Sequence, residues 1–370
     1  MTFLITRTRL ISLFVLAAAI VGGGGWLLWK RAHRTWYPTS EQLTTPRLAL
    51  ARLPDETVFT TAPGREWLFR EKPACVPAAA KDPEGALSKR MNRAVQEPGV
   101  FRELDREVRF AAVWLFGDPS WFKPLLEHLI ETKDFTVAYL DHGSIIFRRG
   151  ADDKTTPEAT LMSSAQRFED PRERAFLLAN GAVRFASLRQ GETAARCLHA
   201  AEESSASIPD VWSAWSVYRM TKGDWDKALV AAERALSIDP NFIPGLACKV
   251  QTLFAMKRFP EAYKLSERLV LTSPEDPSIL FYHAKLAHEA RAFDAEIEAL
   301  QRLIALGEKA GVNVSSYRIY LAQALAHKGE GDNAKNQLTL ALLDTSLPRE
   351  QRQKADELLG HIQEQIRKLQ

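Results

Sequence analysis

A few residues with reactive side chains lie in the middle of the chain and limit the chemistry it could perform. Asp118, Asp141 and His142 could meet at one edge of a folded domain, where an imidazole beside a carboxylate can act as a base. His142, however, stands in an Asp-His-Gly turn, where a histidine is more often exposed surface. The sequence brings no nucleophile, base and orienting group together, so we expect no catalytic residues and no enzyme.

Motifs that bind metals or cofactors are also missing from the sequence. Cys75, Cys197 and Cys248 lack the C-x-x-C spacing of a zinc site. The number of cysteines is low and odd, which argues against a disulfide framework. We interpret them as small buried apolar residues. His283 and His288 are five residues apart and cannot share a helix face as the histidines of an H-E-x-x-H motif do. We therefore expect neither a metal nor a cofactor.

Length, composition and charge are those of an ordinary globular protein. The 370 residues are enough for about two domains and a terminal segment. Hydrophobic residues make up 46% of the chain and charged residues 26%. The net charge of +3, from 49 basic and 46 acidic residues, does not favour a nucleic-acid partner, which requires a clustered basic face. The glycine run at 22–25 lacks the Lys-Ser/Thr of a phosphate loop.

An uncharged stretch of 20 residues, Leu10–Trp29, lies near the amino terminus. As a helix it would be about 30 Å long, which matches the hydrocarbon core of a bilayer. The pattern predicts an uncleaved transmembrane helix over residues 10–29, after a tail of residues 1–9 and before a linker of residues 30–54. The alternative is a cleaved signal peptide, for which the alanines at 17–19 offer a cleavage site.

The short tail and the large region after the span predict a membrane location. We expect a single-pass protein of the inner (cytoplasmic) membrane, with its carboxy-terminal domains periplasmic or otherwise extracytoplasmic. Basic residues on the two sides of the span are nearly equal in number, so they specify the orientation only weakly. The pair Ala18 and Gly22 would let two spans pack closely, which indicates a possible homo-oligomer.

Residues 55–150 alternate short apolar runs with amphipathic stretches, which predicts a small α/β domain. FTVAYLDHGSIIFRRG predicts a hairpin with its turn at residues 141–143. This domain resembles the soluble module that follows the membrane part of some bacterial polytopic glycosyltransferases. The resemblance implies a cell-envelope context without glycosyl transfer, because the polytopic catalytic part is missing. The expected strands are Thr57–Thr60, Ala74–Pro77, Phe110–Phe116, Phe135–Leu140 and Ser144–Arg149.

Residue types recur with a period of 34 in the second half of the chain. Helix–turn–helix units of this length are the signature of tetratricopeptide repeats. The segment KGDWDKALVAAERALSIDPN resembles the second half of that family's consensus. A glycine permits the tight turn, small alanines let the helices approach, and a proline ends the second helix. The positions that carry the pattern are Gly223, Trp225, Ala228, Pro240, Phe259, Ala262, Pro274 and Phe293.

This resemblance implies a mainly α fold, in which a tetratricopeptide-like α-solenoid of about four to five hairpins covers residues 171–347. We expect the small α/β domain and the transmembrane helix to precede it. A degenerate first hairpin has Gly191 at its turn, and residues 307–314 hold about four extra residues. Lys257 and Arg291 replace the turn glycine in later units, and Glu296 replaces a small alanine. The polar helix of residues 348–370 suits a solenoid cap.

In the family, the first helix of each pair lines a concave groove that binds peptides. The cationic set that grips a terminal carboxylate in some members is missing, because Ser213, Ala214, Ala247 and Cys248 stand there. We therefore expect an extended or helical peptide segment as the ligand. The groove positions carried over from the family are Ser213, Val217, Met220, Gln251, Phe254, Phe281, Lys285, His288, Gln323 and His327.

The sequence as a whole predicts a membrane-anchored, non-catalytic scaffold that binds protein or peptide partners in the bacterial cell envelope. Two other functions stay open. The α/β domain could bind a sugar or another small ligand, as an enzyme or accessory protein whose repeats recruit partners. Alternatively, repeats of neighbouring molecules could pair in a pure assembly role.

Overall fold

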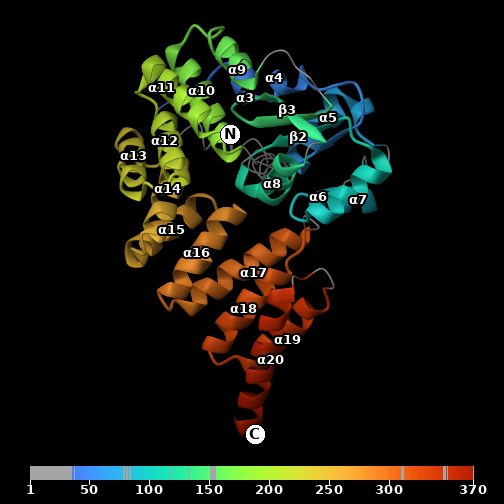
Figure 1. Ribbon diagram of the computed structural model, residues 1–370. Helices are drawn as coiled ribbons and strands as arrows, with labels where there is room; N and C mark the ends of the chain where they lie inside the picture. Colours follow the sequence, from blue (N-terminus) through green and yellow to red (C-terminus); the bar gives the residue numbers. More distant parts are fainter. Residues whose placement is uncertain are drawn as a thin grey trace, which may run out of the picture.

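The computed structural model describes residues 36–369, apart from 37, 78, 79, 81, 83, 84, 118, 133, 151–155, 310, 311, 345, 346 and 348. A small sheet with its helices is followed by an arc of helical hairpins that ends at the carboxy terminus (Figure 1). The chain is therefore mainly helical with one small sheet in the described part, as the sequence predicted.

The sheet has four strands in the order β1-β2-β4-β3. β1 pairs in parallel with β2, whereas β4 lies antiparallel to both β2 and β3. The predicted hairpin is confirmed, since Oδ1 of Asp141 accepts hydrogen bonds from the backbone nitrogens of Gly143 and Ser144, both at 2.9 Å. The strands are β1 (Val58–Thr60), β2 (Ala112–Phe116), β3 (Phe135–Leu140) and β4 (Ser144–Arg149).

The strand predicted over Ala74–Pro77 is wrong. Residues Pro73–Cys75 form a short 3-10 turn, η2, with Cys75 buried. Pro73 and Pro77 flank this segment, and a proline has no backbone N–H to donate to a sheet. The apolar residues that suggested a strand instead form a turn that is buried at Cys75.

Helices cover both faces of the sheet. Phe59 of β1 meets the ring of Phe101, at 5.1 Å between centroids, from a helix on one face. On the other face Gly64 lies so close to Thr60 and Trp114 that a side chain at position 64 would collide with Thr60. The helical elements of this domain are α5 (Ala62–Glu71), α6 (Ala86–Ala94), α7 (Pro98–Val108), η4 (Pro119–Phe122) and α8 (Lys123–Glu131).

The α/β domain and the first hairpins share one continuous hydrophobic core, which extends from Leu43 to Phe242. Within the segment predicted as a linker, α3 (Glu41–Thr44) and α4 (Arg47–Leu50) bury Leu43 and Leu50 in this core. α9 (Pro157–Ala165) contacts β3 as well as the first hairpin. The two domains are therefore packed against each other.

Five helix pairs follow in the described residues. The first helices of the second, third and fourth pairs begin at residues 209, 243 and 277, which confirms the 34-residue period. The fifth begins at 315, four residues later than that period, as the predicted insertion requires. The pairs are α10 (Pro171–Ser187) with α11 (Gly191–Ser205), α12 (Pro209–Thr221) with α13 (Trp225–Ile238), α14 (Ile243–Ala255) with α15 (Phe259–Thr272), α16 (Pro277–Glu289) with α17 (Phe293–Lys309), and α18 (Ser315–His327) with α19 (Gly331–Leu342).

Each hairpin turns through one residue in the left-handed conformation. The next backbone N–H returns to the carbonyl five residues earlier, as from Asp224 to Arg219 at 3.0 Å, in a Schellman motif. The predicted turn at Gly191 is wrong, because Arg189 holds the left-handed position and Gly191 begins α11 against Lys222. The left-handed residues are Arg189, Gly223, Lys257, Arg291 and Gly329.

The small residues of the repeat lie where helices approach most closely. Ala228 and Ala262 are fully buried. Trp225, one of the aromatic positions that carry the repeat, keeps 38% of its surface exposed at the start of α13. At the end of the array, α20 (Arg349–Leu369) packs against α18 and α19 through buried Ala355 and Ile362. The last helix thus covers the final hairpin.

The helices in the described part of the chain correct the predicted single-pass membrane location. None of them combines the length and the apolar character needed to cross a bilayer. The longest of these, α20, has 21 residues but carries charged side chains along its whole length. The predicted span, residues 10–29, and the tail before it lie outside the described residues.

Candidate peptide groove between the hairpins and the α/β domain

A groove of about 970 Å³ runs along the inner side of the first four hairpins. Its lining comes mainly from α10, α12, α14 and α16, the first helix of each pair, as the repeat pattern predicted. The opposite wall comes from η4 and α8 of the α/β domain, which the repeat pattern could not predict. In Figure 1, α8 lies beside the inner helices. The groove is therefore composite, with the sheet domain as a second wall.

Apolar side chains from several elements dominate the lining. They include Val183 of α10, Val217 and Met220 of α12, and Leu126 of α8. Polar groups are spaced between them. At one end Glu127 of α8 lies 3.9 Å from the guanidinium of Arg189, which joins the α/β domain to the first hairpin turn. Such a lining suits a ligand with apolar side chains and a few polar groups.

Four of the ten predicted groove residues line this groove. They are Ser213, Val217, Met220 and Gln251. Val217, Met220 and Gln251 are half-buried and keep part of their surface open. Ser213 is buried, and its hydroxyl donates to the carbonyl of Asp210 at 3.0 Å.

The other six predicted residues lie outside this lining, on α14, α16 and α18. Phe254 packs edge-on against Phe259, at 5.6 Å between ring centroids. Phe281 contacts the rings of Tyr317 and Tyr320 from α18, and the ammonium of Lys285 lies 4.4 Å from the Phe281 ring centre. Burial lowers the pKa of Lys285. Phe281 and the two tyrosines form an aromatic cluster that joins α16 to α18.

A second cluster connects the ends of the same helices. His288 lies 3.1 Å from both carboxylate oxygens of Glu296, and burial raises the pKa of Glu296 although His288 opposes this. The ring of His327 stacks on Phe293 at 5.3 Å. Gln323 is half-buried on α18. Glu296, which departs from the repeat pattern, is thus buried with a histidine partner.

The candidate residues of the α/β domain are used in its packing. Asp118 lies outside the described residues. Asp141 accepts a hydrogen bond from the hydroxyl of Tyr139 at 3.1 Å, in addition to its bonds within the turn. The His142 ring lies 5.7 Å from that of Phe176 in α10, and burial lowers the pKa of His142. Neither Asp141 nor His142 lines the groove.

The three cysteines are free and buried. Burial raises the pKa of Cys197 to about 12, so its thiol is protonated at neutral pH. Cys248 lines the groove, and its sulfur lies 3.7 Å from the carbonyl oxygen of Ser213. Among the described residues, no group of three or more His, Cys, Asp or Glu side chains is placed to hold a metal ion.

Comparisons with known proteins bear on the fold alone. No protein-family model and no curated protein matches the chain. Solved structures that resemble it include MamA from Desulfovibrio magneticus (19% identity, TM-score 0.39, 45% of this chain and 91% of that one). Another is a TPR protein of Thermus thermophilus (15%, 0.38, 49% and 97%). A third is PilF of Pseudomonas aeruginosa (16%, 0.43, 56% and 93%).

These neighbours are tetratricopeptide proteins, which agrees with the hairpin period measured above. At such low identity and TM-score, the hairpin geometry itself carries the assignment of a tetratricopeptide-like fold. The comparisons do not show the predicted resemblance of residues 55–150 to a glycosyltransferase module.

Proposed function

We propose that this protein is a non-catalytic scaffold that binds a peptide segment of a partner protein in the composite groove. The observation that carries the proposal is the groove itself, with four inner helices on one side and α8 on the other. Val217 and Met220 offer apolar contacts, and Gln251 offers hydrogen bonds to a peptide backbone. A segment that fits between two walls buries more apolar surface than one lying on an open solenoid.

The lining favours binding over catalysis. No histidine stands among the described residues that line the groove. The hydroxyl of one lining serine, Ser266, lies 2.9 Å from Nδ1 of His283, but Ser266 is buried and does not present this hydroxyl to a ligand. Ser213, Ala214, Ala247 and Cys248 all line the groove, and none of them is cationic. An internal segment, rather than a chain end gripped by its carboxylate, is therefore the proposed ligand.

The test compares two aspartate variants of the full chain. Met220→Asp places a charge in the groove, whereas Val230→Asp places one on α13, where Val230 is already 65% exposed. Each protein is used to purify partners from its own cells, and the retained proteins are quantified by mass spectrometry. We expect at least one partner to be kept by wild type and Val230→Asp and reduced about tenfold with Met220→Asp, a loss of about 1.4 kcal/mol. Identical partner sets for the two folded variants would contradict the proposal.

A further inference from the structure

The described chain begins beside the groove. Trp36 lies edge-on to Phe176 of α10, at 6.1 Å between ring centroids, and Phe176 lines the groove. The guanidinium of Arg172 lies 5.7 Å from the Trp36 ring centre. Any residues that precede Trp36 therefore start from the edge of the groove.

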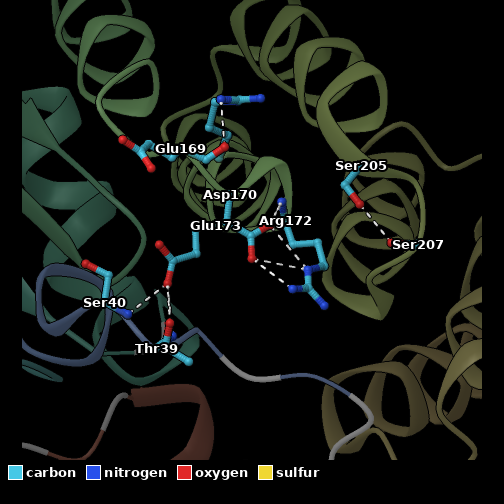
Figure 2. Close-up of polar contacts among 9 residues, drawn as sticks. Thr39, Ser40, Glu169, Asp170, Arg172, Glu173, Ser205 and Ser207 are labelled. Atoms are coloured by element: carbon cyan, nitrogen blue, oxygen red, sulfur yellow. Dashed lines mark hydrogen bonds and ion pairs between the residues drawn. The ribbon is translucent and has the colours of Figure 1, made fainter.

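Glu173 holds this starting point in place. Its Oε1 atom accepts hydrogen bonds from the backbone nitrogens of Thr39, at 2.9 Å, and Ser40, at 2.8 Å. The Thr39 hydroxyl donates to the same oxygen at 3.1 Å. Figure 2 shows the Glu173 side chain pointing from α10 toward this segment. Because Glu173 is buried, water competes poorly for these bonds.

The segment upstream has the composition of a ligand for an apolar groove. Residues 10–29 carry no charge and include five leucines and isoleucines before the glycine run at 22–25. An apolar stretch of this size is unfavourable in water and requires a surface to cover it. Trp29 is seven residues from Trp36, a distance of at most about 25 Å for an extended chain. The groove is therefore within reach of the segment's end.

We propose that residues 10–29 of the same chain bind in the composite groove and cover it until a partner peptide displaces them. A segment joined by so short a connection has an effective concentration on the order of millimolar. If its own contact had a dissociation constant of about 10 µM, the groove would be free about 1% of the time, and partner affinity would fall about a hundredfold. The proposal rests on the proposed function for the identity of the site, and it adds an internal competitor.

The test is photo-crosslinking in the full chain. A benzoylphenylalanine at position 217 reports from inside the groove, and one at position 230 of α13 is the matched control. Labelling is done with phosphatidylcholine–phosphatidylglycerol vesicles present, so that the apolar segment has an alternative to the groove. Mixing ordinary and ¹⁵N-labelled protein distinguishes crosslinks within one chain from crosslinks between chains.

We expect position 217, and not position 230, to crosslink to residues 10–29 of the same chain. The double substitution Leu13→Asp with Leu16→Asp should reduce that crosslink at least about tenfold, because burying two carboxylates in the groove is costly. A crosslink between chains would place a second copy in the groove, and a missing crosslink would place the segment in lipid. Either result overturns the proposal.

The two proposals fail separately. If the internal crosslink forms but Met220→Asp keeps every partner, the groove is closed by its own chain and the scaffold function is wrong. If Met220→Asp loses partners while the crosslink is missing, the scaffold function stands and the internal occupant is wrong. If the scaffold function and the internal occupant are both correct, the Leu13→Asp, Leu16→Asp variant should retain more partner than wild type.

Discussion

Oε1 of Glu173 lies 2.8 Å from the backbone nitrogen of Ser40, a residue 133 positions earlier in the chain. Asp170, one turn earlier, instead caps its own helix by accepting from the nitrogen of Arg172 at 2.8 Å. The two neighbouring acidic residues thus have different structural roles. Asp170 stabilises the start of α10, and Glu173 ties the beginning of the described chain to the first hairpin.

Replacing Glu173 should therefore loosen that beginning selectively. We expect Glu173→Ala to lower the free energy of unfolding by about 1–3 kcal/mol, because the partly buried backbone N–H groups of Thr39 and Ser40 lose their carboxylate acceptor. Amide exchange should accelerate in residues 38–50 and stay unchanged in α14–α19. Glu169→Ala, an exposed neighbour in the same turn, is the control and should change stability by less than about 0.5 kcal/mol. Equal effects of the two substitutions would show that the contact contributes nothing.

The left-handed turn residues predict that the same substitution, Gly→Ala, changes stability in opposite directions at two positions. Gly223 has φ of 73°, and a Cβ built there would meet nothing within 4 Å. Gly360, inside α20, also has open space around it but has helical backbone. We expect Gly223→Ala to destabilise by about 1 kcal/mol and Gly360→Ala to stabilise by about 0.5–1 kcal/mol, measured by chemical denaturation. The same sign at both positions would refute the role of the left-handed turn.

The same geometry predicts that two natural departures from glycine are costly. Lys257 and Arg291 occupy left-handed positions, with φ of 60° and 56°. We expect Lys257→Gly and Arg291→Gly each to raise the free energy of unfolding by about 0.5–1 kcal/mol. Lys227→Gly on the helical α13 is the control and should lower it by about 1 kcal/mol. Stability lost at positions 257 and 291 would mean that their side chains contribute more than the turn costs.

Local periodicity was enough to predict the hairpins, and with them the inner helices that carry Val217 and Met220. The 34-residue period appears at positions with small and aromatic residues, which pack against near neighbours in the chain. The second wall of the groove could not be predicted in this way. Leu126 reaches the groove only because α8 and α10 share a core between elements far apart in sequence.

The wrong predictions for Gly191 and His142 also arise from constraints that the local sequence does not contain. A glycine at position 191 looked like the turn residue, but Arg189 adopts the left-handed conformation, which side-chain type alone does not reveal. His142 looked exposed because its tripeptide forms a turn. The structure leaves only 12% of its side chain exposed, because α10 places Phe176 over that turn. In both positions a tertiary or backbone constraint overrides the local preference.

The burial of His142 predicts how stability depends on pH. Burial lowers the pKa of His142 below its ordinary value near 6.5, and Arg184 adds to this while Asp141 opposes it. The unfolded chain therefore binds a proton more readily than the folded one as the pH falls below about 6.5. Stability should be fully present above that pH and should decrease with acidification, by up to about 1.4 kcal/mol per pH unit for one histidine.

Urea denaturation at pH 7.5, 6.5 and 5.5 checks this dependence. We expect His142→Gln to flatten the loss of stability between pH 6.5 and 5.5, whereas His361→Gln, at an exposed position on α20, should leave it unchanged. His283, which is also buried and whose pKa burial also lowers, offers a second variant if His142→Gln folds poorly. Wild-type stability that is constant over this range would mean that the folded protein accepts the proton, and that the ring of His142 reaches water despite its contact with Phe176.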